Sequence, residues 1–144
     1  MRYWDSSSIV PLLVEEAGSE WAWSLIESDP EIVTWWATLV ECTSAIARLE
    51  RSGQIQGPEV GAVFTRLNGL ADGWTEISPT DTVRERARRL LRVHPLRAGD
   101  ALQLAAALSA AEGYPETLPF VSLDDRQVTA ADREALSVVR FDPS

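Results

Sequence analysis

The spacing of apolar and polar positions along the chain switches between a pattern typical of strands and a pattern typical of helices. Short runs rich in β-branched and aromatic residues, typical of strands, cover residues 2–4, 31–36, 74–77, 118–123 and 137–141. Between these runs, apolar residues recur at intervals of three and four, which is typical of helices. The predicted helices cover residues 6–15, 19–28, 38–51, 58–72, 79–93, 97–112 and 125–134. Strands alternate with helices throughout, and this order predicts one α/β domain over residues 1–144 with a parallel sheet.

Local signals mark some of the helix ends. Gly53 is the expected stop of the helix over 38–51. Ser78 is the expected cap of the helix over 79–93, with Pro79 in its first position and Asp81 in its third. The helix over 97–112 is apolar nearly all round, so we expect it to be buried.

The composition is that of an ordinary globular protein. The chain has 144 residues, of which 45% are hydrophobic and 24% charged, with a net charge of −9. No run approaches the roughly 18 apolar residues of a membrane helix. Asp5 also stands where a signal peptide needs its apolar stretch. We therefore expect a cytoplasmic protein with no membrane segment.

The rare residue types exclude several kinds of chemistry. All 13 basic residues are arginine, which excludes P-loop and lysine Schiff-base enzymes. The single cysteine, Cys42, excludes an internal disulfide, and the single histidine, His94, excludes metal sites with two histidines. Carboxylates remain as the main source of catalytic chemistry, and they prefer hard cations such as Mg²⁺ or Mn²⁺.

Acidic residues stand where strands of the predicted sheet end. Asp5 follows the first strand and Asp124 follows the strand over 118–123, while Glu41 and Asp100 lie early in two helices. Sites in parallel sheets form at the carboxyl ends of the strands, so these carboxylates could meet at one edge. Two like charges about 5 Å apart repel by roughly 3 kcal/mol at an effective dielectric near 20. A divalent cation would relieve this repulsion, polarise a phosphodiester and lower the pKa of bound water.

Each acid also has a local explanation. Asp5 could cap the next helix, Asp124 with Gln127 fits an Asp-x-x-Gln capping box, and Asp100 could complement a helix dipole. Glu41 could be a solvated helix residue. Taken singly, the local role is favoured for every acid except Asp100, whose neighbours leave it little solvent. Taken together, at these positions, the metal cluster is the better hypothesis.

Four segments resemble one known family. Residues 1–10 resemble its first strand with an aspartate and following hydroxyls, and 39–48 resemble the helix that carries its glutamate. Residues 94–107 contain Leu-Arg-Ala-Gly-Asp-Ala-Leu-Gln-Leu-Ala, the most specific match, and 120–126 resemble the strand that ends in its last acid. Together they resemble the PIN-domain ribonucleases, and among these the VapC toxins of bacterial toxin–antitoxin pairs.

The resemblance implies a three-layer α/β/α fold and a set of site residues. The catalytic acids that bind Mg²⁺ or Mn²⁺ would be Asp5, Glu41, Asp100 and Asp124. Beside them, Asp125 is a further acid near the metal, and Ser6 and Ser122 match hydroxyl positions that hold an acid or a metal-bound water. The chain departs from the family at 133–136, Arg-Glu-Ala-Leu, where the family often has a glycine before the last strand.

The implied activity is hydrolysis of RNA, with tRNA-like targets, by metal-activated water. Asp5 and Asp100 would hold one ion, with Asp124 direct or through water, and Glu41 would help to place the ion or the water. A second ion is expected only with substrate. The implied partners are a VapB-like antitoxin and a second copy of the chain.

Arginines and aromatic residues supply candidate RNA contacts. Six arginines fall between residues 84 and 97, mostly on the outer face of a helix, where a solvated surface is the simpler explanation. Arg97, one turn before Asp100, is the best placed to meet RNA, and Arg48 is a second candidate. Trp35 and Trp36 are adjacent, so we expect them on opposite faces of a strand.

The sequence leaves two alternative functions to compare with this one. The first is a PIN-like binding or scaffold module without nuclease activity, which the presence of all four acids argues against. The second is a small-molecule phosphohydrolase of the haloacid-dehalogenase type. That class needs a second aspartate where Ser7 stands and a lysine that this chain lacks. We expect His94 to be a turn residue, and Cys42 to face inward without chemistry.

Overall fold

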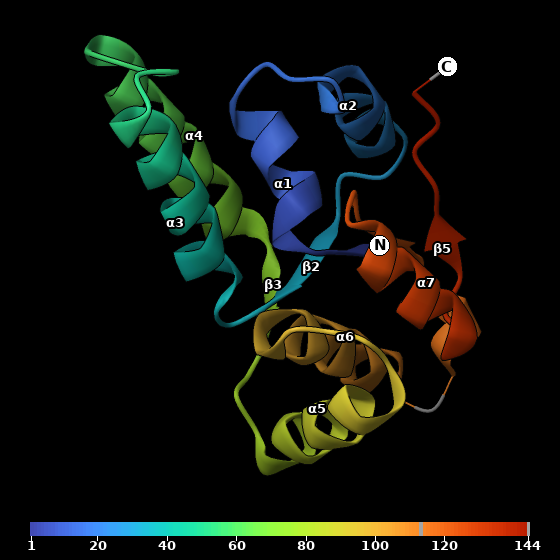
Figure 1. Cartoon of the computed structure of the whole chain (residues 1–144). Helices are drawn as coiled ribbons and strands as arrows, with labels where there is room; N and C mark the ends of the chain where they lie inside the picture. The colour runs from blue at the N-terminus through green and yellow to red at the C-terminus, as the bar shows by residue number, and fades with distance from the viewer. Residues whose placement is uncertain (113, 144) are drawn as a thin grey trace.

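A parallel sheet forms the centre of the protein. The computed structural model describes residues 1–112 and 114–143, and within these residues five strands pair in the order β3–β2–β1–β4–β5 (Figure 1). Every neighbouring pair is parallel. The strands are β1 (Arg2–Trp4), β2 (Ile32–Trp35), β3 (Thr75–Ile77), β4 (Phe120–Val121) and β5 (Val138–Val139).

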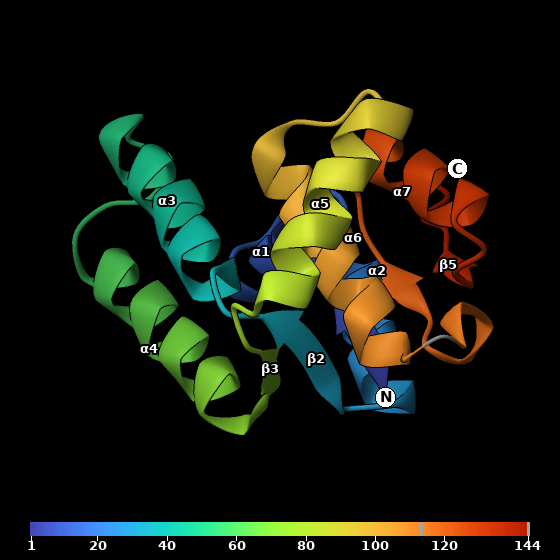
Figure 2. The ribbon, with the colours of Figure 1, turned by 90° about the horizontal axis from the view of Figure 1, so that it is seen from below.

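Helices cover both faces of the sheet. They are α1 (Ser6–Leu13), α2 (Ser19–Ser28), α3 (Thr38–Arg51), α4 (Pro58–Gly73), α5 (Asp81–Val93), α6 (Ala98–Ala111) and α7 (Asp125–Arg133), with a short 3₁₀ turn at Pro115–Thr117. α1 to α4 pack on one face and α5 to α7 on the other, which confirms the predicted three-layer α/β/α fold (Figures 1 and 2). Within the described residues, no helix is long and apolar enough to cross a membrane.

Neighbouring residues of the central strands pack into the cores on opposite faces of the sheet. On β1, Tyr3 belongs to the core under α5 and α6, whereas Trp4 belongs to the core under α1 and α3. β4 repeats this division with Phe120 and Val121, and the Tyr3 ring stacks on Phe120 with centroids 5.7 Å apart. A strand buried on both faces is expected to be apolar at every position, which explains the continuous runs in the sequence.

The chain changes direction across the sheet between β1 and β4. It runs outward from β1 through β2 to β3, and then returns to add β4 and β5 on the other side of β1. The carboxyl ends of β1 and β4 are therefore adjacent, and the backbone N–H of Asp5 donates to the carbonyl of Val121 at 3.1 Å. Such a switch point is where parallel sheets bind ligands.

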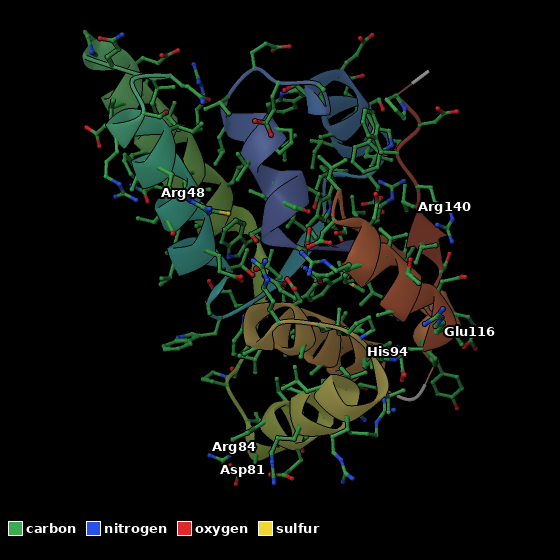
Figure 3. All side chains as sticks on the ribbon, viewed as in Figure 1. Arg48, Asp81, Arg84, His94, Glu116 and Arg140 are labelled. Atoms are coloured by element: carbon green, nitrogen blue, oxygen red, sulfur yellow. The ribbon has the colours of Figure 1, made fainter. Side chains whose placement is uncertain are left out.

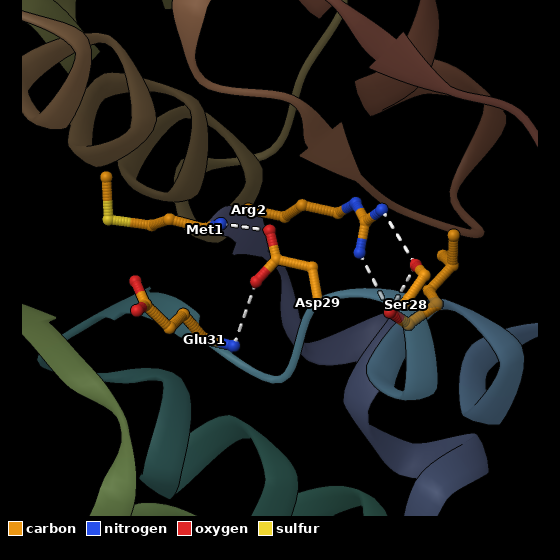
Figure 4. A network of polar contacts seen from close by, with 6 residues as sticks. Met1, Arg2, Ser28, Asp29 and Glu31 are labelled. Carbon is orange, nitrogen blue, oxygen red and sulfur yellow. Dashed lines mark hydrogen bonds and ion pairs between the residues drawn. The ribbon is translucent and has the colours of Figure 1, made fainter.

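A polar network holds the amino end of β1 (Figure 4). The ammonium group of Met1 pairs with the carboxylate of Asp29, which also accepts the backbone N–H of Glu31 at 3.2 Å. The guanidinium of Arg2 donates to Ser28 at 3.0 Å. These contacts tie β1 to the connection between α2 and β2, at the end of the sheet opposite Asp5.

Several element ends differ from the sequence-based prediction. The strands expected over 118–123 and 137–141 are only two residues long, and the first helix ends at Leu13 rather than at residue 15. α5 begins after Thr80, not after Ser78, because the Thr80 hydroxyl accepts the N–H of Val83 at 3.3 Å. The short turn at Pro115–Thr117 was not predicted.

Two helices end in the same Schellman cap but with different residues. At the end of α3, Gly53 has φ of +79°, and the residue after it donates to the Leu49 carbonyl at 3.0 Å. At the end of α7, Ala135 has φ of +67°, and the residue after it donates to the Ala131 carbonyl at 3.0 Å. Ala135 therefore occupies a left-handed position that suits glycine, at the place where the resemblance leads one to expect it.

Candidate active site at the carboxyl edge of the sheet

Asp5 lies at the centre of the candidate site. Its side chain is 0% exposed, directly after β1. The Ser7 hydroxyl donates to Oδ1 at 2.7 Å, the Ser8 backbone N–H donates to Oδ1 at 3.3 Å, and the Ser122 hydroxyl donates to Oδ2 at 3.0 Å. Burial, with a smaller contribution from the charge of Asp124, raises the pKa of Asp5 to about 7 despite these hydrogen bonds. Asp5 caps α1, as its local explanation predicted, and also faces other site residues.

One amide nitrogen joins Asp5 to Asp100. The Nε2 atom of Gln127 lies 2.7 Å from Oδ2 of Asp5 and 3.2 Å from Oδ1 of Asp100. Asp100 is the third residue of α6, and its other oxygen accepts the backbone N–H of Arg97 at 3.3 Å. Two acids 95 positions apart in the numbering thus meet across a single polar group.

Gln103, which lies on α6, fixes the carboxylate of Glu41. Its Nε2 atom donates to Oε1 of Glu41 at 2.6 Å and to the Thr38 hydroxyl at 3.1 Å, while its Oε1 accepts the Tyr3 hydroxyl at 2.7 Å. Burial raises the pKa of Glu41, and the charge of Asp100 adds to this rise. A Cβ on Gly99 would lie 3.4 Å from Oε2 of Glu41, so the start of α6 approaches this carboxylate closely.

Asp124 stands at the rim and caps α7. Its Oδ1 accepts the backbone N–H of Arg126 at 2.9 Å, and its own N–H donates to the Ser122 hydroxyl at 3.0 Å. The same Ser122 hydroxyl donates to Oδ2 of Asp5 at 3.0 Å, so one side chain links Asp124 to Asp5. Gln127 does not complete the expected capping box, because its side chain turns inward to Asp5.

The other predicted site residues lie at different distances from this centre. Ser122 contacts Asp5 as described, but within the described residues Ser6 has no hydrogen bond to an acid, and Ser7 and Ser8 contact the Asp5 carboxylate instead. Asp125 is exposed at the start of α7 and makes no hydrogen bond to the other acids in this part of the chain. Arg97 is exposed beside Asp100, whereas Arg48 lies in the last turn of α3, on its exposed surface (Figure 3).

Gln103 and Gln127 were not predicted as site residues. Gln103 is a lone amide in a helix otherwise rich in alanine and leucine, and both glutamines are buried. A buried amide requires polar partners, so an amide within an apolar stretch is the signal that could have found Gln103. For Gln127, the sequence pattern indicates only a local helix cap.

The charge of the site affects neighbouring groups. Burial, together with the charges of Asp5 and Glu41, raises the pKa of Tyr3 well above its ordinary value. The same causes raise the pKa of Cys42 to about 12. Cys42 therefore stays a neutral thiol and has no role as a nucleophile, as expected.

The donor set suits a hard divalent cation. Asp5, Glu41, Asp100 and Asp124 supply oxygen ligands, and the raised pKa of Asp5 and Glu41 marks a cost of ionisation that a cation would relieve. Gln127 adds a buried amide oxygen with no hydrogen-bond partner. Within the described residues, no three His, Cys, Asp or Glu side chains stand ready as a metal group. Amide groups lie against the carboxylates instead.

His94 and the arginines of α5 have structural roles. His94 is buried at the end of α5, and its Nε2 lies 2.7 Å from Glu134, which also pairs with Arg89 at 2.5 Å. On the outer surface of α5, Arg84 pairs with Asp81 at 2.8 Å (Figure 3). The pair of Arg84 and Asp81 agrees with a solvated outer surface of α5. The contact between His94 and Glu134 links α5 to the end of α7, so His94 has a structural role rather than a catalytic one.

Comparison with known proteins identifies the family. The family model of the PIN domain matches residues 2–133. Ribonuclease VapC45 and Ribonuclease VapC49 of Mycobacterium tuberculosis are each 31% identical to this chain over 110 residues, which is 74% of this chain and 74% of each relative. A toxin–antitoxin complex from Klebsiella pneumoniae contains a similar fold, with a TM-score of 0.63 and 16% identity over 100% of this chain and 98% of that one. The chain therefore belongs to the PIN-domain family, and VapC ribonucleases are among its relatives.

Proposed function

We propose that this protein is a metal-dependent endoribonuclease and the toxin of a toxin–antitoxin pair. The observation that carries the proposal is the meeting of Asp5 and Asp100 on one amide nitrogen, at the switch point of the sheet. The relatives named as VapC ribonucleases support the reaction class.

The ion would be Mg²⁺ or Mn²⁺, held chiefly by Asp5 and Asp100, with Asp124 direct or through water. Such an ion, when bound, polarises a phosphodiester and supplies a hydroxide-like water at neutral pH. Glu41, fixed by Gln103, would orient the attacking water and accept its proton. The hydroxyls of Ser7 and Ser122 keep the Asp5 carboxylate in one orientation.

Exposed residues beside the acids supply the proposed RNA contacts. Arg97 would meet a phosphate one helical turn from Asp100. The strand predicted over 31–36 ends at Trp35, which is buried, whereas Trp36 lies in the turn after β2 and is 58% exposed. The Trp36 ring packs edge-on against Trp35 with centroids 6.4 Å apart, so a fixed indole surface is available for an unpaired base, as in the loops of tRNA-like substrates. Arg48 would contact RNA only where the RNA extends from the acids to the last turn of α3.

An antitoxin is the proposed protein partner. The Klebsiella pneumoniae relative by fold was solved as a toxin–antitoxin complex, which supports a VapB-like partner for this chain. A net charge of −9 and a carboxylate-lined edge favour a basic segment, which would compete with the divalent ion. A homodimer is the expected assembly, and sedimentation of the purified protein tests it.

The test of the nuclease is cleavage of total RNA and of tRNA in Mg²⁺, in Mn²⁺ and in EDTA. Asp100→Asn keeps a side chain that accepts the Arg97 N–H, so it should fold and yet lose more than about 100-fold in activity, since even indirect partners of a metal site contribute 10- to 100-fold. The matched control is Asp81→Asn, an exposed acid in the first turn of α5, which should retain full activity.

The outcomes separate the two candidate functions. Discrete cleavage that requires both the ion and Asp100 supports the nuclease. A folded protein that binds no Mn²⁺ and cuts no RNA contradicts it and favours the scaffold alternative. Equal activity of Asp100→Asn and Asp81→Asn would mean that the site has been wrongly assigned.

A further inference from the structure

Gln127 points into the site instead of closing a helix cap. In a capping box, the third side chain of the helix returns to the backbone N–H of the cap residue. Here the N–H of Asp124 already donates to the Ser122 hydroxyl, and the Asp124 carboxylate accepts from Arg126. The cap is satisfied without Gln127, so its amide is free to reach the acids from β1 and α6.

The Gln127 amide acts between two carboxylates. Its nitrogen donates to Asp5 at 2.7 Å and to Asp100 at 3.2 Å, which uses both hydrogens of the NH₂ group. These hydrogens place partial positive charge between two like charges. In the absence of an ion, only the nitrogen end of the amide is compatible with this position, because the oxygen end would face two anionic oxygens.

This orientation leaves the other end of the amide unpaired. Gln127 is 3% exposed, and its Oε1 is buried with no hydrogen-bond partner. Buried carbonyl oxygens are nearly always paired, so the lone oxygen calls for a physical explanation. Gln103 gives the contrast, because Tyr3 donates to its oxygen and its nitrogen contacts Thr38 and Glu41.

We propose that Gln127 is a positioning residue with two orientations: its nitrogen holds Asp5 and Asp100 together in the ion-free protein, and its oxygen faces the ion when the site is loaded. This inference rests on the proposed metal dependence. A cation repels the NH₂ hydrogens and attracts the amide oxygen, which is an accepted ligand type for hard divalent ions. The terminal torsion of glutamine is broad and roughly two-fold, so the turn requires no change of backbone.

The first test follows the side-chain amide of Gln127 by NMR in ¹⁵N-labelled protein during titration with Mg²⁺. Gln127→Leu assigns the resonance by its loss. We expect the Gln127 NH₂ signals to move together with the backbone signals of Asp5 and Asp100, while those of the exposed Gln56 stay in place. Movement of the backbone signals with a fixed Gln127 amide would overturn the inference and leave the metal site intact.

The second test measures Mg²⁺ affinity by calorimetry, with no RNA present. Gln127→Leu should bind Mg²⁺ about tenfold more weakly than the parent protein, since loss of one partner in a metal site typically has this effect. Gln127→Glu should bind more tightly, yet unfold at a lower temperature in EDTA, because three carboxylates then face one another. Gln56→Leu is the matched control, with unchanged affinity.

The direction in which Gln127→Leu changes the Mg²⁺ affinity distinguishes the proposal from a purely structural role. If the amide only fills the space of the ion, its removal in Gln127→Leu strengthens Mg²⁺ binding, and the inference is wrong. If the parent protein binds no Mg²⁺ at millimolar concentration, the metal dependence itself fails, and this inference fails with it. If Gln127→Leu does not fold, Gln127→Glu, which also lacks the side-chain NH₂ group, assigns the resonance, and the NMR titration of the parent protein decides alone.

Discussion

The amide nitrogen of Gln103 lies 2.6 Å from Oε1 of Glu41, so a neutral side chain of α6 fixes a carboxylate of α3. The same amide receives the Tyr3 hydroxyl from β1. Three elements of the fold thus converge on one buried side chain whose hydrogen-bonding groups are all used. The position of Glu41 is set by the core rather than by solvent.

Replacement of Gln103 by leucine should destabilise the protein. The change leaves the Tyr3 hydroxyl and the Glu41 carboxylate without a partner, and each such loss costs about 1–3 kcal/mol. We expect the free energy of unfolding, measured by urea denaturation, to fall by at least about 2 kcal/mol. Gln56→Leu, an exposed change, should stay within about 0.5 kcal/mol. Equal losses in the two variants would contradict this role.

The buried carboxylate of Asp5 should make the ion-free protein less stable at high pH. Its pKa is near 4 in the unfolded chain and about 7 in the folded protein, so the folded state binds the extra proton between these values. Stability is therefore lost as pH rises from about 4 to about 7, by roughly 4 kcal/mol for three pKa units. Denaturation in EDTA at pH 5 and at pH 8, compared with Asp5→Asn, isolates this contribution. A parallel dependence in the two proteins would disprove it.

The two Schellman caps allow a matched pair of substitutions. Ala135→Gly removes the penalty of a left-handed alanine and should raise the free energy of unfolding by about 1 kcal/mol. Gly53→Ala introduces that penalty and should lower it by a similar amount. Both glycine and alanine leave the cap hydrogen bonds in place. Thermal denaturation of both variants tests the prediction, and a shift of the same sign in each would refute it.

Arg97 should contribute one phosphate contact. In the inactive Asp100→Asn background, Arg97→Ala should weaken RNA binding and reduce the slope of log affinity against log salt by about one unit. Arg84→Ala is the control, because Arg84 already pairs with Asp81. Arg48→Ala should have a smaller effect than Arg97→Ala on a short RNA. Fluorescence anisotropy at several salt concentrations measures all three, and equal slopes for Arg97→Ala and Arg84→Ala would remove Arg97 from the RNA surface.

The order of elements and the edge that carries the acids were predictable from sequence, for a physical reason. Strands buried on both faces are apolar throughout, and a parallel sheet brings the residues after its strands to one edge. Asp5 and Asp124 follow adjacent strands, so their proximity follows from topology. The two-residue lengths of β4 and β5 were not predictable, since apolar side chains continue beyond the paired backbone.

The sequence pattern did not predict contacts in which two side chains compete for one hydrogen-bond partner. The Asp-x-x-Gln sequence at residues 124–127 matches a capping box, but the Ser122 hydroxyl accepts the backbone N–H of Asp124 that a capping Gln127 would have accepted. The Gln127 side chain contacts Asp5 instead. Likewise, the choice of Ser7 over Ser6 depends on where the first turn of α1 begins. Each case is decided by a residue from another part of the structure or by a rotation of one position along a helix.

The site joins residues that are far apart in the order of synthesis. Gln127 and Asp5 are 122 positions apart, and the central strand β1 finds its neighbour β4 only after α6 has been made. Long-range parallel pairing of this kind is slow to form. A growing chain on the ribosome therefore carries Asp5 without Ser122 and Gln127 for most of its translation, and translation must pass residue 127 before the group of carboxylates can assemble.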